Sequence, residues 1–269
     1  MANRLRFTIL GCGTSTGVPR IGGDWGECDP DNPKNHRTRC SLLAEQFGAG
    51  DKPTRILIDT SPDMRQQVLR AGIGSLDAVF YSHGHADHIH GIDDLRGFAM
   101  NMRRRVEVYA DKPTMRRLKT GFGYCFHTPE GSDYPPILNG NDFVAGEKVT
   151  ISGAGGPLTA LPILQNHGGI PSLGFRIGNL AYSPDVNGLP AEAVDALCDL
   201  DVWIVDALRY KPHPSHFSLE ETLAWIGKLK PKRAILTHMH IDLDYEKLRR
   251  SLPDGIEPAF DGMVVEMHA

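Results

Sequence analysis

Three histidines and one aspartate lie within six consecutive positions, directly after the apolar run at residues 78–81. They are His83, His85, Asp87 and His88. If the chain is extended there, residues two apart project to the same side, so His83 and His85 can converge on one point. If a helix begins near Asp87, the Asp87 carboxylate and the His88 ring face a second point. The spacing therefore predicts two adjacent cation sites.

Imidazole together with carboxylate is a donor set typical of zinc, manganese or iron. The absence of thiols close by in the sequence argues against a closed structural zinc site. The alternative is a surface loop whose histidines are merely solvated. Because His-x-His-x-Asp-His rarely arises by chance, the metal-binding interpretation is favoured. Open coordination positions would make the metals catalytic.

The motif resembles the signature of the metallo-β-lactamase superfamily of hydrolases. The resemblance implies one domain over residues 1–269 with an α/β fold, an αββα sandwich in which two mixed β-sheets are flanked by helices. It also implies further metal ligands at later strand ends, and His167, Asp185 and His238 follow apolar runs in that order. Taken singly, each of these three could equally be a capping or internally bonded residue.

Carried over residue by residue, the resemblance assigns two divalent metal ions, Mn²⁺ or Zn²⁺. His83, His85 and His167 would bind one metal, Asp87, His88 and His238 the other, and Asp185 would bridge them. Two cations about 3.5 to 4 Å apart lower the pKa of a bridging water toward neutrality. Asp87 is therefore assigned a catalytic as well as a ligand role.

His216 is the candidate general acid, because an alkoxide leaving group needs a proton that no metal ligand can spare. It stands just before a helix predicted at residues 219–226. Ser218 matches an N-cap, with Glu221 three positions on as a capping box. A helix N-terminus also offers N–H groups to a phosphate, so His216 is a candidate substrate contact too. The alternative is a loop histidine whose charged form that N-terminus disfavours.

Two further segments could contact an anionic substrate. The Gly/Ser/Thr loop at residues 11–19 leaves N–H groups free to point at a phosphate, which makes Ser15 and Thr16 candidates. In the polar stretch at residues 20–39, Arg37 and Arg39 form a small basic cluster. The alternatives are a tight turn between strands and a solvated run of charge.

Several segments beyond the metal signature resemble one branch of the superfamily. They are Gly11-x-Gly13-x-Ser15-x-Gly17-Val18-Pro19, His216 before a helix, Leu236-Thr237-His238, and Phe260-Asp261-Gly262-Met263. The branch contains the cyclic phosphodiesterases of the carbon-phosphorus lyase pathway, which open 5-phosphoribosyl 1,2-cyclic phosphate, and it is similar in a wider sense to tRNA 3′-processing nucleases. The resemblance implies a phosphodiesterase acting on a small cyclic or nucleotide-like substrate.

One departure from that branch concerns a structural zinc, which the family holds with three closely spaced cysteines and a histidine. Here the corresponding loop has only Cys28, and position 241 is Ile. We therefore expect no structural zinc, with Asp24, Trp25 and Glu27 ordering the loop by packing and hydrogen bonds. The departure keeps other functions open: hydrolysis of a thioester, lactone or β-lactam by the same metals, or a nonenzymatic metal or nucleotide sensor.

Composition limits the partners. The 269 residues carry a formal charge of −4, with a pI near 6.3, so we expect no stable nucleic-acid partner. The five cysteines are scattered, which is typical of reduced thiols in the cytosol. No apolar run is long enough to be a signal or a membrane span, so a cytoplasmic location is expected. A homodimer is compatible with the sequence, which leaves the oligomeric state open.

Strands alternating with helices must position these side chains. We predict strands at residues 5–10, 40–44, 55–60, 106–109, 147–151, 158–163, 174–177, 180–182 and 202–206. Helices are predicted at residues 62–71, 92–98, 114–124 and 219–226. The resemblance gives Asp59, at the end of a strand, a role in supporting the metal loop. Residues 125–141 are predicted to be an irregular lid or edge insertion, with Phe126, His127 and Tyr134 as candidates to line a cleft.

Overall fold

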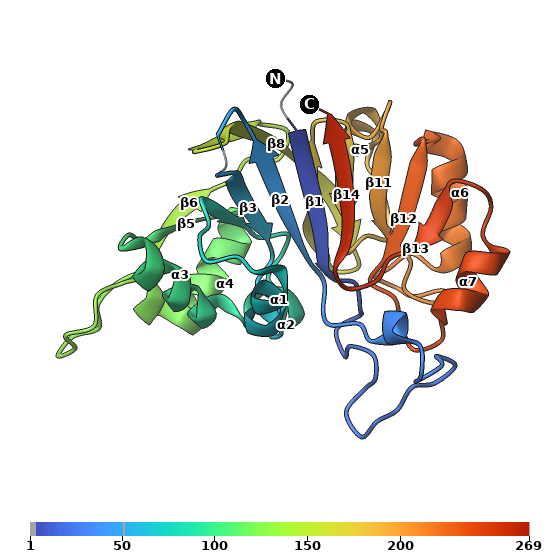
Figure 1. Cartoon of the computed structure of the whole chain (residues 1–269), viewed down its shortest axis with the longest axis horizontal. Helices are drawn as coiled ribbons and strands as arrows, with labels where there is room; N and C mark the ends of the chain where they lie inside the picture. The colour runs from blue at the N-terminus through green and yellow to red at the C-terminus, as the bar shows by residue number, and fades with distance from the viewer. Residues whose placement is uncertain (1–3, 51, 269) are drawn as a thin grey trace. The chain divides into compact units, whose positions relative to one another are not determined.

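The structure is a computed structural model that describes residues 4–50 and 52–268, and these form two mixed β-sheets with helices beside them (Figure 1). Contacts within the chain define two compact units, each assembled from segments distant in sequence. Unit 1 comprises residues 4–10, 41–50, 52–159 and 264–268, and unit 2 comprises residues 11–40 and 160–263. The α/β class with two mixed sheets is confirmed, whereas the single domain stays a prediction.

The first sheet has seven strands in the order β14-β1-β2-β3-β4-β5-β6. Its strands are β1 (Arg4–Gly11), β2 (Ser41–Phe47), β3 (Thr54–Ile58), β4 (Ala78–Phe80), β5 (Val106–Ala110), β6 (Leu138–Asp142) and β14 (Met263–His268). β2 and β3 are antiparallel, whereas β3, β4, β5 and β6 run parallel. Every residue of β4 is buried, as is typical of a strand inside a parallel sheet. The chain leaves β4 just before His83, so a fully buried strand carries the motif.

Helices of unit 1 pack on this sheet through one hydrophobic core. They are α1 (Met64–Ala71), α2 (Ala86–Ile89), α3 (Leu95–Met102) and α4 (Lys112–Phe122), with short 3₁₀ turns at η2 (Ile92–Asp94) and η3 (Gly123–Cys125). Met64, Leu95 and Leu118 of the helices share that core with Val79 and Val108 of the strands. Burial of each such side chain contributes roughly 1.5–3 kcal/mol, which fixes the strand that bears the motif.

The second sheet has seven strands in the order β13-β12-β11-β10-β9-β8-β7. Its strands are β7 (Val149–Gly153), β8 (Gly156–His167), β9 (Ile170–Ile177), β10 (Leu180–Ser183), β11 (Val202–Asp206), β12 (Arg233–Thr237) and β13 (Ile256–Pro258). β10, β11, β12 and β13 are parallel, so their carboxyl ends meet at one edge. The helices of unit 2 are η1 (Pro33–Asn35), α5 (Ala191–Ala196), α6 (Leu219–Leu229) and α7 (Tyr245–Ser251).

The start of α6 is capped as predicted. The Ser218 hydroxyl accepts from Glu221 N at 3.3 Å, and Ser218 N donates to the Glu221 carboxylate at 2.8 Å. Each residue thus satisfies a backbone N–H that the helix leaves unbonded. This reciprocal pair fixes where α6 begins and therefore where the chain around His216 must turn.

Residues 126–137 are irregular, as expected, and the structure corrects only the end of the segment predicted at residues 125–141. The segment begins at the last residue of η3 and ends in the edge strand β6, parallel to β5. Asn, Gly and Asp disfavour strands, so propensity gave no signal. Pairing is supplied instead by Glu107 of β5, whose carboxylate accepts from the Asn139 amide at 2.6 Å and the Asn141 amide at 2.9 Å. The sequence also gave no prediction of the short helices α5 and α7.

The lobe at residues 20–39 is ordered by packing and hydrogen bonds, as expected. Val18, Cys28 and Ile241 form a small buried cluster, and Trp25 packs against it. Glu27 N donates to Ile241 O at 2.9 Å, and Gly26 N donates to the Asp24 carboxylate at 3.1 Å. The apolar side chain of Ile241 thus lies among the contacts that hold residues 20–39 in place.

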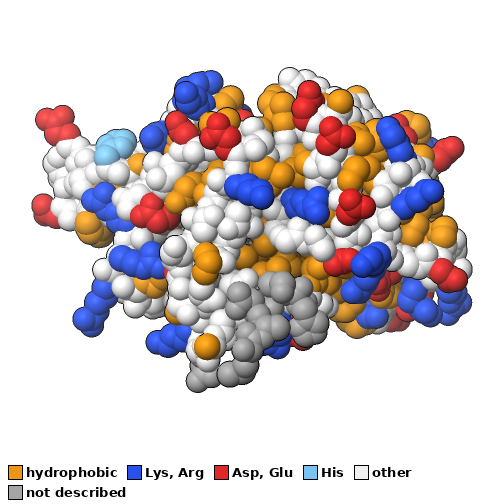
Figure 2. Space-filling model, turned by 90° about the horizontal axis from the view of Figure 1, so that it is seen from above, with side chains coloured by type: hydrophobic (Ala, Val, Ile, Leu, Met, Phe, Trp, Pro, Cys, Tyr) orange, Lys and Arg blue, Asp and Glu red, His pale blue; other side chains and the backbone are white. Residues whose placement is uncertain are grey.

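One face of the molecule carries both signs of charge. On the face drawn in Figure 2, Lys and Arg side chains alternate with Asp and Glu, and hydrophobic side chains lie between them. Within residues 4–50 and 52–268, none of the helices combines the length and apolar composition needed to cross a bilayer.

Gly91 is predicted to be irreplaceable at the end of the motif segment. Its N–H donates to Thr60 O at 2.9 Å, and a Cβ added there would lie 2.1 Å from Ser61 O. Gly91→Ala should therefore lower the free energy of unfolding by roughly 1–3 kcal/mol, measured by urea denaturation. Gly97→Ala is the matched control, because a Cβ in α3 meets nothing within 4 Å. It should be neutral or stabilising by up to about 1 kcal/mol, and equal losses in both variants would contradict the assignment.

Candidate metal centre

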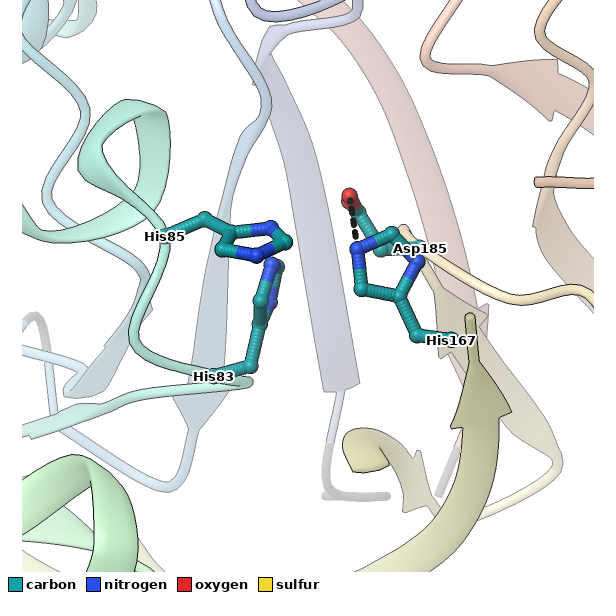
Figure 3. Close-up of side chains that lie close together, drawn as sticks. All are labelled: His83, His85, His167 and Asp185. Carbon is teal, nitrogen blue, oxygen red and sulfur yellow. Dashed lines mark ion pairs between the residues drawn. The ribbon is translucent and has the colours of Figure 1, made fainter. Parts of the chain in front are cut away.

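The motif of unit 1 changes from extended chain to helix at the predicted point. His85 is extended, with φ −72° and ψ 153°, and α2 begins at Ala86. His83 and His85 project from the same loop with ring centroids 4.5 Å apart (Figure 3). On α2, the Asp87 carboxylate lies 3.4 Å from His88 Nε2. The His88 ring centroid also lies 4.4 Å from that of His83, so the loop pair and the helix pair adjoin on one segment.

Asp59 anchors this segment from the end of β3. Its carboxylate is fully buried and accepts from Ser82 N at 2.8 Å, Ser82 Oγ at 2.8 Å and His88 Nδ1 at 2.7 Å. Because a carboxylate can only accept here, Nδ1 of His88 carries the proton, and Nε2 is left with the lone pair that a metal requires. Burial raises the pKa of the Asp59 carboxyl, and the contacts with His88 and Ser82 oppose that rise. The predicted supporting role of Asp59 agrees with these bonds.

Unit 2 gathers its donors around Asp185. Asp185 Oδ2 lies 3.5 Å from His238 Nε2, 3.6 Å from His167 Nε2 and 3.8 Å from His216 Nε2. The pair of Asp185 with His167 is drawn in Figure 3. All four side chains are buried. His167 ends β8, Asp185 follows β10 and His238 follows β12, so strand ends bring them together as the predicted order requires.

Backbone and carboxylate acceptors fix the ring orientations in unit 2. His167 Nδ1 donates to Ser215 O at 2.6 Å, which leaves its Nε2 toward Asp185 as an acceptor or ligand. His216 Nδ1 donates to Asp206 Oδ2 at 2.7 Å. The His216 ring is also stacked on His238, with centroids 4.5 Å apart and an interplanar angle of 16°. The His216 ring is therefore held both by a hydrogen bond and by a stacked neighbour.

Asp206 belongs to the candidate site by its contacts, and the sequence reasoning missed it. It ends β11, its side chain is fully buried, and it accepts from Val186 N at 3.1 Å as well as from His216. Burial raises the pKa of the Asp206 carboxyl, while the charge and the hydrogen bond of His216 act in the opposite direction. The sequence feature that could have identified Asp206 is a carboxylate directly after the four apolar residues 202–205.

The donor set fits a divalent transition metal. In unit 2 alone, ligand atoms of Asp185, His216 and His238 all lie within 4.8 Å of one another. Imidazole nitrogen with carboxylate oxygen, oriented by acceptors on the far side of the rings, is the arrangement by which proteins bind zinc and manganese. Which residues bind which metal ion stays a prediction.

The predicted substrate contacts have different surroundings. Ser15 and Thr16 are exposed, on a turn closed by Gly17 N donating to Thr14 O at 2.8 Å. Arg39 is partly buried beside that turn, since a Cβ on Gly17 would lie 3.9 Å from its terminal nitrogen. These three residues form the part of the prediction that we retain.

Arg37 requires a correction. Its side chain is only 2% exposed, and it donates to Leu243 O at 2.6 Å, Asn35 Oδ1 at 3.1 Å and His240 O at 3.3 Å. Carbonyl oxygens, rather than a phosphate, thus occupy its donors. These buried hydrogen bonds join the lobe at residues 20–39 to the segment after β12. Arg37 is therefore left out of the proposed substrate site.

Comparison with known proteins identifies relatives of the whole chain. The model of the beta-lactamase superfamily domain matches residues 54–239. A curated protein of Porphyromonas gingivalis (strain ATCC BAA-308 / W83) named octanoyltransferase is 36% identical over 264 residues. The match covers 96% of this chain and 51% of that protein, so the chain spans about half the length of the curated relative it matches.

Two solved structures are similar over nearly the entire chain. A diphosphatase from the PhnP family is 37% identical, covers 99% of this chain and 98% of its own, and superposes with a TM-score of 0.87. Zn²⁺-bound PqqB from Methylobacterium extorquens is 17% identical, covers 97% of this chain and 100% of its own, and has a TM-score of 0.74. The second likeness concerns the fold alone. Together they confirm the predicted fold class.

Asp59→Asn tests the orientation of His88. Asn tolerates the left-handed backbone of this position, φ 63°, but has only one acceptor oxygen for the three donors from Ser82 and His88. The affinity of the metal-free protein for Zn²⁺ should fall by about 10- to 100-fold, measured by calorimetric titration. Asp94→Asn, at an exposed carboxylate of η2, is the control and should leave affinity unchanged. Wild-type affinity in Asp59→Asn would refute the role.

Proposed function

The chain belongs to the beta-lactamase superfamily and is a metal-dependent hydrolase, and from that premise we propose that it cleaves a P–O bond in a small cyclic or nucleotide-like phosphodiester. The pair formed by Asp206 and His216 beside Asp185 carries the proposal. An alkoxide expelled from phosphorus is a strong base, so its departure requires a proton donor. The likeness to a PhnP-family diphosphatase also favours phosphorus.

We assign the metal ligands as the sequence predicts them. His83, His85 and His167 would hold one ion, Asp87, His88 and His238 the other, and Asp185 both. Two divalent ions, Mn²⁺ or Zn²⁺, would supply activated water at neutral pH and offset the negative charge of the phosphate. The oriented imidazoles of His88 and His167 support this assignment, since each has its Nδ1 bonded to an acceptor.

His216 is assigned the transfer of the proton. Asp206 accepts from Nδ1 and thereby favours the imidazolium form and keeps Nε2 on the side of Asp185. Stacking on His238 opposes rotation of the ring. When the P–O bond breaks, the Nε2 proton passes to the leaving oxygen, and His216 becomes neutral. Ser15, Thr16 and Arg39 are assigned to the non-bridging phosphate oxygens.

The partners and location follow from the same proposal. A small phosphate ester fills the role of substrate, without a stable nucleic-acid partner and without a membrane. We place the reaction in the cytoplasm, and a homodimer would be compatible with it.

A second candidate is hydrolysis of an acyl thioester. It is favoured by the name of the P. gingivalis relative, which refers to transfer of an octanoyl group, although this chain matches only about half of that protein. The two candidates differ in their need for His216. A thiolate leaves readily, because thiol pKa values are about 8.5, whereas an alkoxide is far more basic. Loss of His216 should therefore affect phosphodiester cleavage much more than thioester cleavage.

His216→Ala should slow phosphodiester turnover about 100-fold or more while the bound metal is retained. Steady-state rates with bis(p-nitrophenyl) phosphate and a cyclic ribose phosphate, alongside elemental analysis, measure both quantities. Glu220→Ala is the control, because Glu220 is exposed in the first turn of α6, the helix that follows His216, and should change neither. An unchanged rate in His216→Ala would remove the proposed role.

A substrate panel distinguishes the two candidates. Metal-loaded protein is assayed against bis(p-nitrophenyl) phosphate, a cyclic ribose phosphate, a nucleoside diphosphate, an octanoyl thioester and a lactone. We expect turnover of the phosphorus compounds. Turnover of the thioester or lactone alone would overturn the phosphorus assignment and support the second candidate.

A further inference from the structure

Asp261 lies in the turn between β13 and β14 and binds two distant segments of unit 2 at once. Its Oδ1 accepts from Cys12 N at 3.1 Å, with Cys12 Sγ at 3.5 Å. Its Oδ2 accepts from Thr38 N at 2.8 Å and from the Thr38 hydroxyl at 2.6 Å. Each carboxylate oxygen thus serves a different part of the chain.

The segments that Asp261 holds are bonded to each other and to the residue after His238. Met239 N donates to Cys12 O at 2.9 Å, and Thr14 N donates to Met239 O at 3.3 Å. Gly13 N, between them, donates to Thr38 O at 2.8 Å. The Cys12 segment therefore fixes the backbone on the C-terminal side of His238.

The N-terminal side of His238 is tied to the same turn. β12 ends one residue before His238 and pairs with β13, with Leu236 opposite Pro258. Ala259 N then donates to Leu236 O at 2.9 Å, two residues before Asp261. The bonds close a ring that runs from β12 through His238 and Met239 to Cys12, on to Asp261, and back through β13.

His238 needs such support because of its backbone. Its φ is +57°, in the left-handed region, which costs a residue with a Cβ about 1 kcal/mol or more. A histidine is held in that region only when its surroundings over-determine the conformation. The ring of hydrogen bonds closed by Asp261 constrains the backbone on both sides of His238.

We propose that Asp261 is a positioning residue that sets the backbone of His238, and with it the direction of the His238 imidazole. This rests on the proposed function in one respect, namely that His238 is a metal ligand. The same carboxylate also holds the start of the loop that bears Ser15 and Thr16, since Cys12 and Thr14 both bond to Met239.

The chemistry of the carboxylate makes the role testable with a nearly isosteric change. Both oxygens of Asp261 face N–H donors, from Cys12 and Thr38. An asparagine has one acceptor oxygen, so its amide N–H₂ must oppose one of those N–H groups. Asp261→Asn therefore opens the ring on one side without removing side-chain volume.

Asp244→Asn provides the matched control. Asp244 is a buried carboxylate of the same unit that accepts from Asn35 Nδ2 at 2.7 Å, Lys247 N at 2.9 Å and Asp29 N at 3.1 Å. It caps α7 and joins that helix to Asp29 and Asn35 of the lobe, but it is not part of the ring of hydrogen bonds around His238. Both substitutions should lower the unfolding temperature, so a merely structural role would make the two variants alike.

The experiment compares the full-length wild-type chain, Asp261→Asn and Asp244→Asn in two measurements. The first records the ring ¹⁵N signals of the histidines in metal-free protein, with His238→Ala to assign the signal. The second titrates the metal-free proteins with Zn²⁺ alone. We expect the His238 signal to shift or broaden only in Asp261→Asn. We also expect Zn²⁺ affinity at one of two sites to fall by about tenfold in that variant only.

The outcomes separate this inference from the proposed function. Wild-type protein that binds no Zn²⁺ would refute the metal site, and the ¹⁵N signals would still decide the positioning role. An unchanged His238 signal in folded Asp261→Asn overturns the inference. If Asp261→Asn does not fold, Thr38→Val takes its place, because it deletes only the hydroxyl donor. A smaller shift of the His238 signal then supports the role, and no shift refutes it.

Discussion

A buried imidazole ring can serve as a ligand only if the nitrogen it does not use is satisfied, and this constraint governs both groups of donors. A ring nitrogen without a partner would cost about 1–3 kcal/mol, and a freely turning ring would present the wrong atom half of the time. Asp59, Asp206 and the carbonyl of Ser215 remove both problems, because each accepts a proton from an Nδ1 at 2.6 to 2.7 Å.

The two units solve the problem with similar parts. In unit 1, Asp59 follows β3 and accepts from His88, and in unit 2, Asp206 ends β11 and accepts from His216. Both carboxylates are fully buried, and burial raises the pKa of each while the facing histidine lowers it. Each carboxylate thus depends on the histidine that it faces to offset its burial, which couples the order of the strand end to the order of the ring.

The sequence predicted what depends on local spacing. The interval between His83 and Asp87 contained the change from extended chain to helix, and Ser218 with Glu221 marked the start of α6. The apolar runs before Asp185 and His238 were strands because residues buried on both faces of a sheet are continuously hydrophobic, whereas the strand before His167 alternates buried and more exposed residues.

The features that could not be predicted from the sequence depend on contacts between distant segments. Arg37 resembled a phosphate contact because a basic residue in a polar stretch carries no mark of the carbonyls that it will meet, 206 positions away at Leu243. β6 was missed for a similar reason, since Glu107 on a neighbouring strand compensates for its poor propensity. Asp206 was overlooked because an aspartate after a strand is as often a cap as a partner of histidine.

The cluster of Trp25, Val18, Cys28 and Ile241 has a consequence for how the lobe at residues 20–39 responds to its environment. Apolar contacts weaken on cooling and in chaotropic solutes such as urea. They do not depend on a metal ion, so a chelator does not weaken them. Removal of any metal bound at the candidate centre is therefore expected to leave the apolar contacts of this lobe in place.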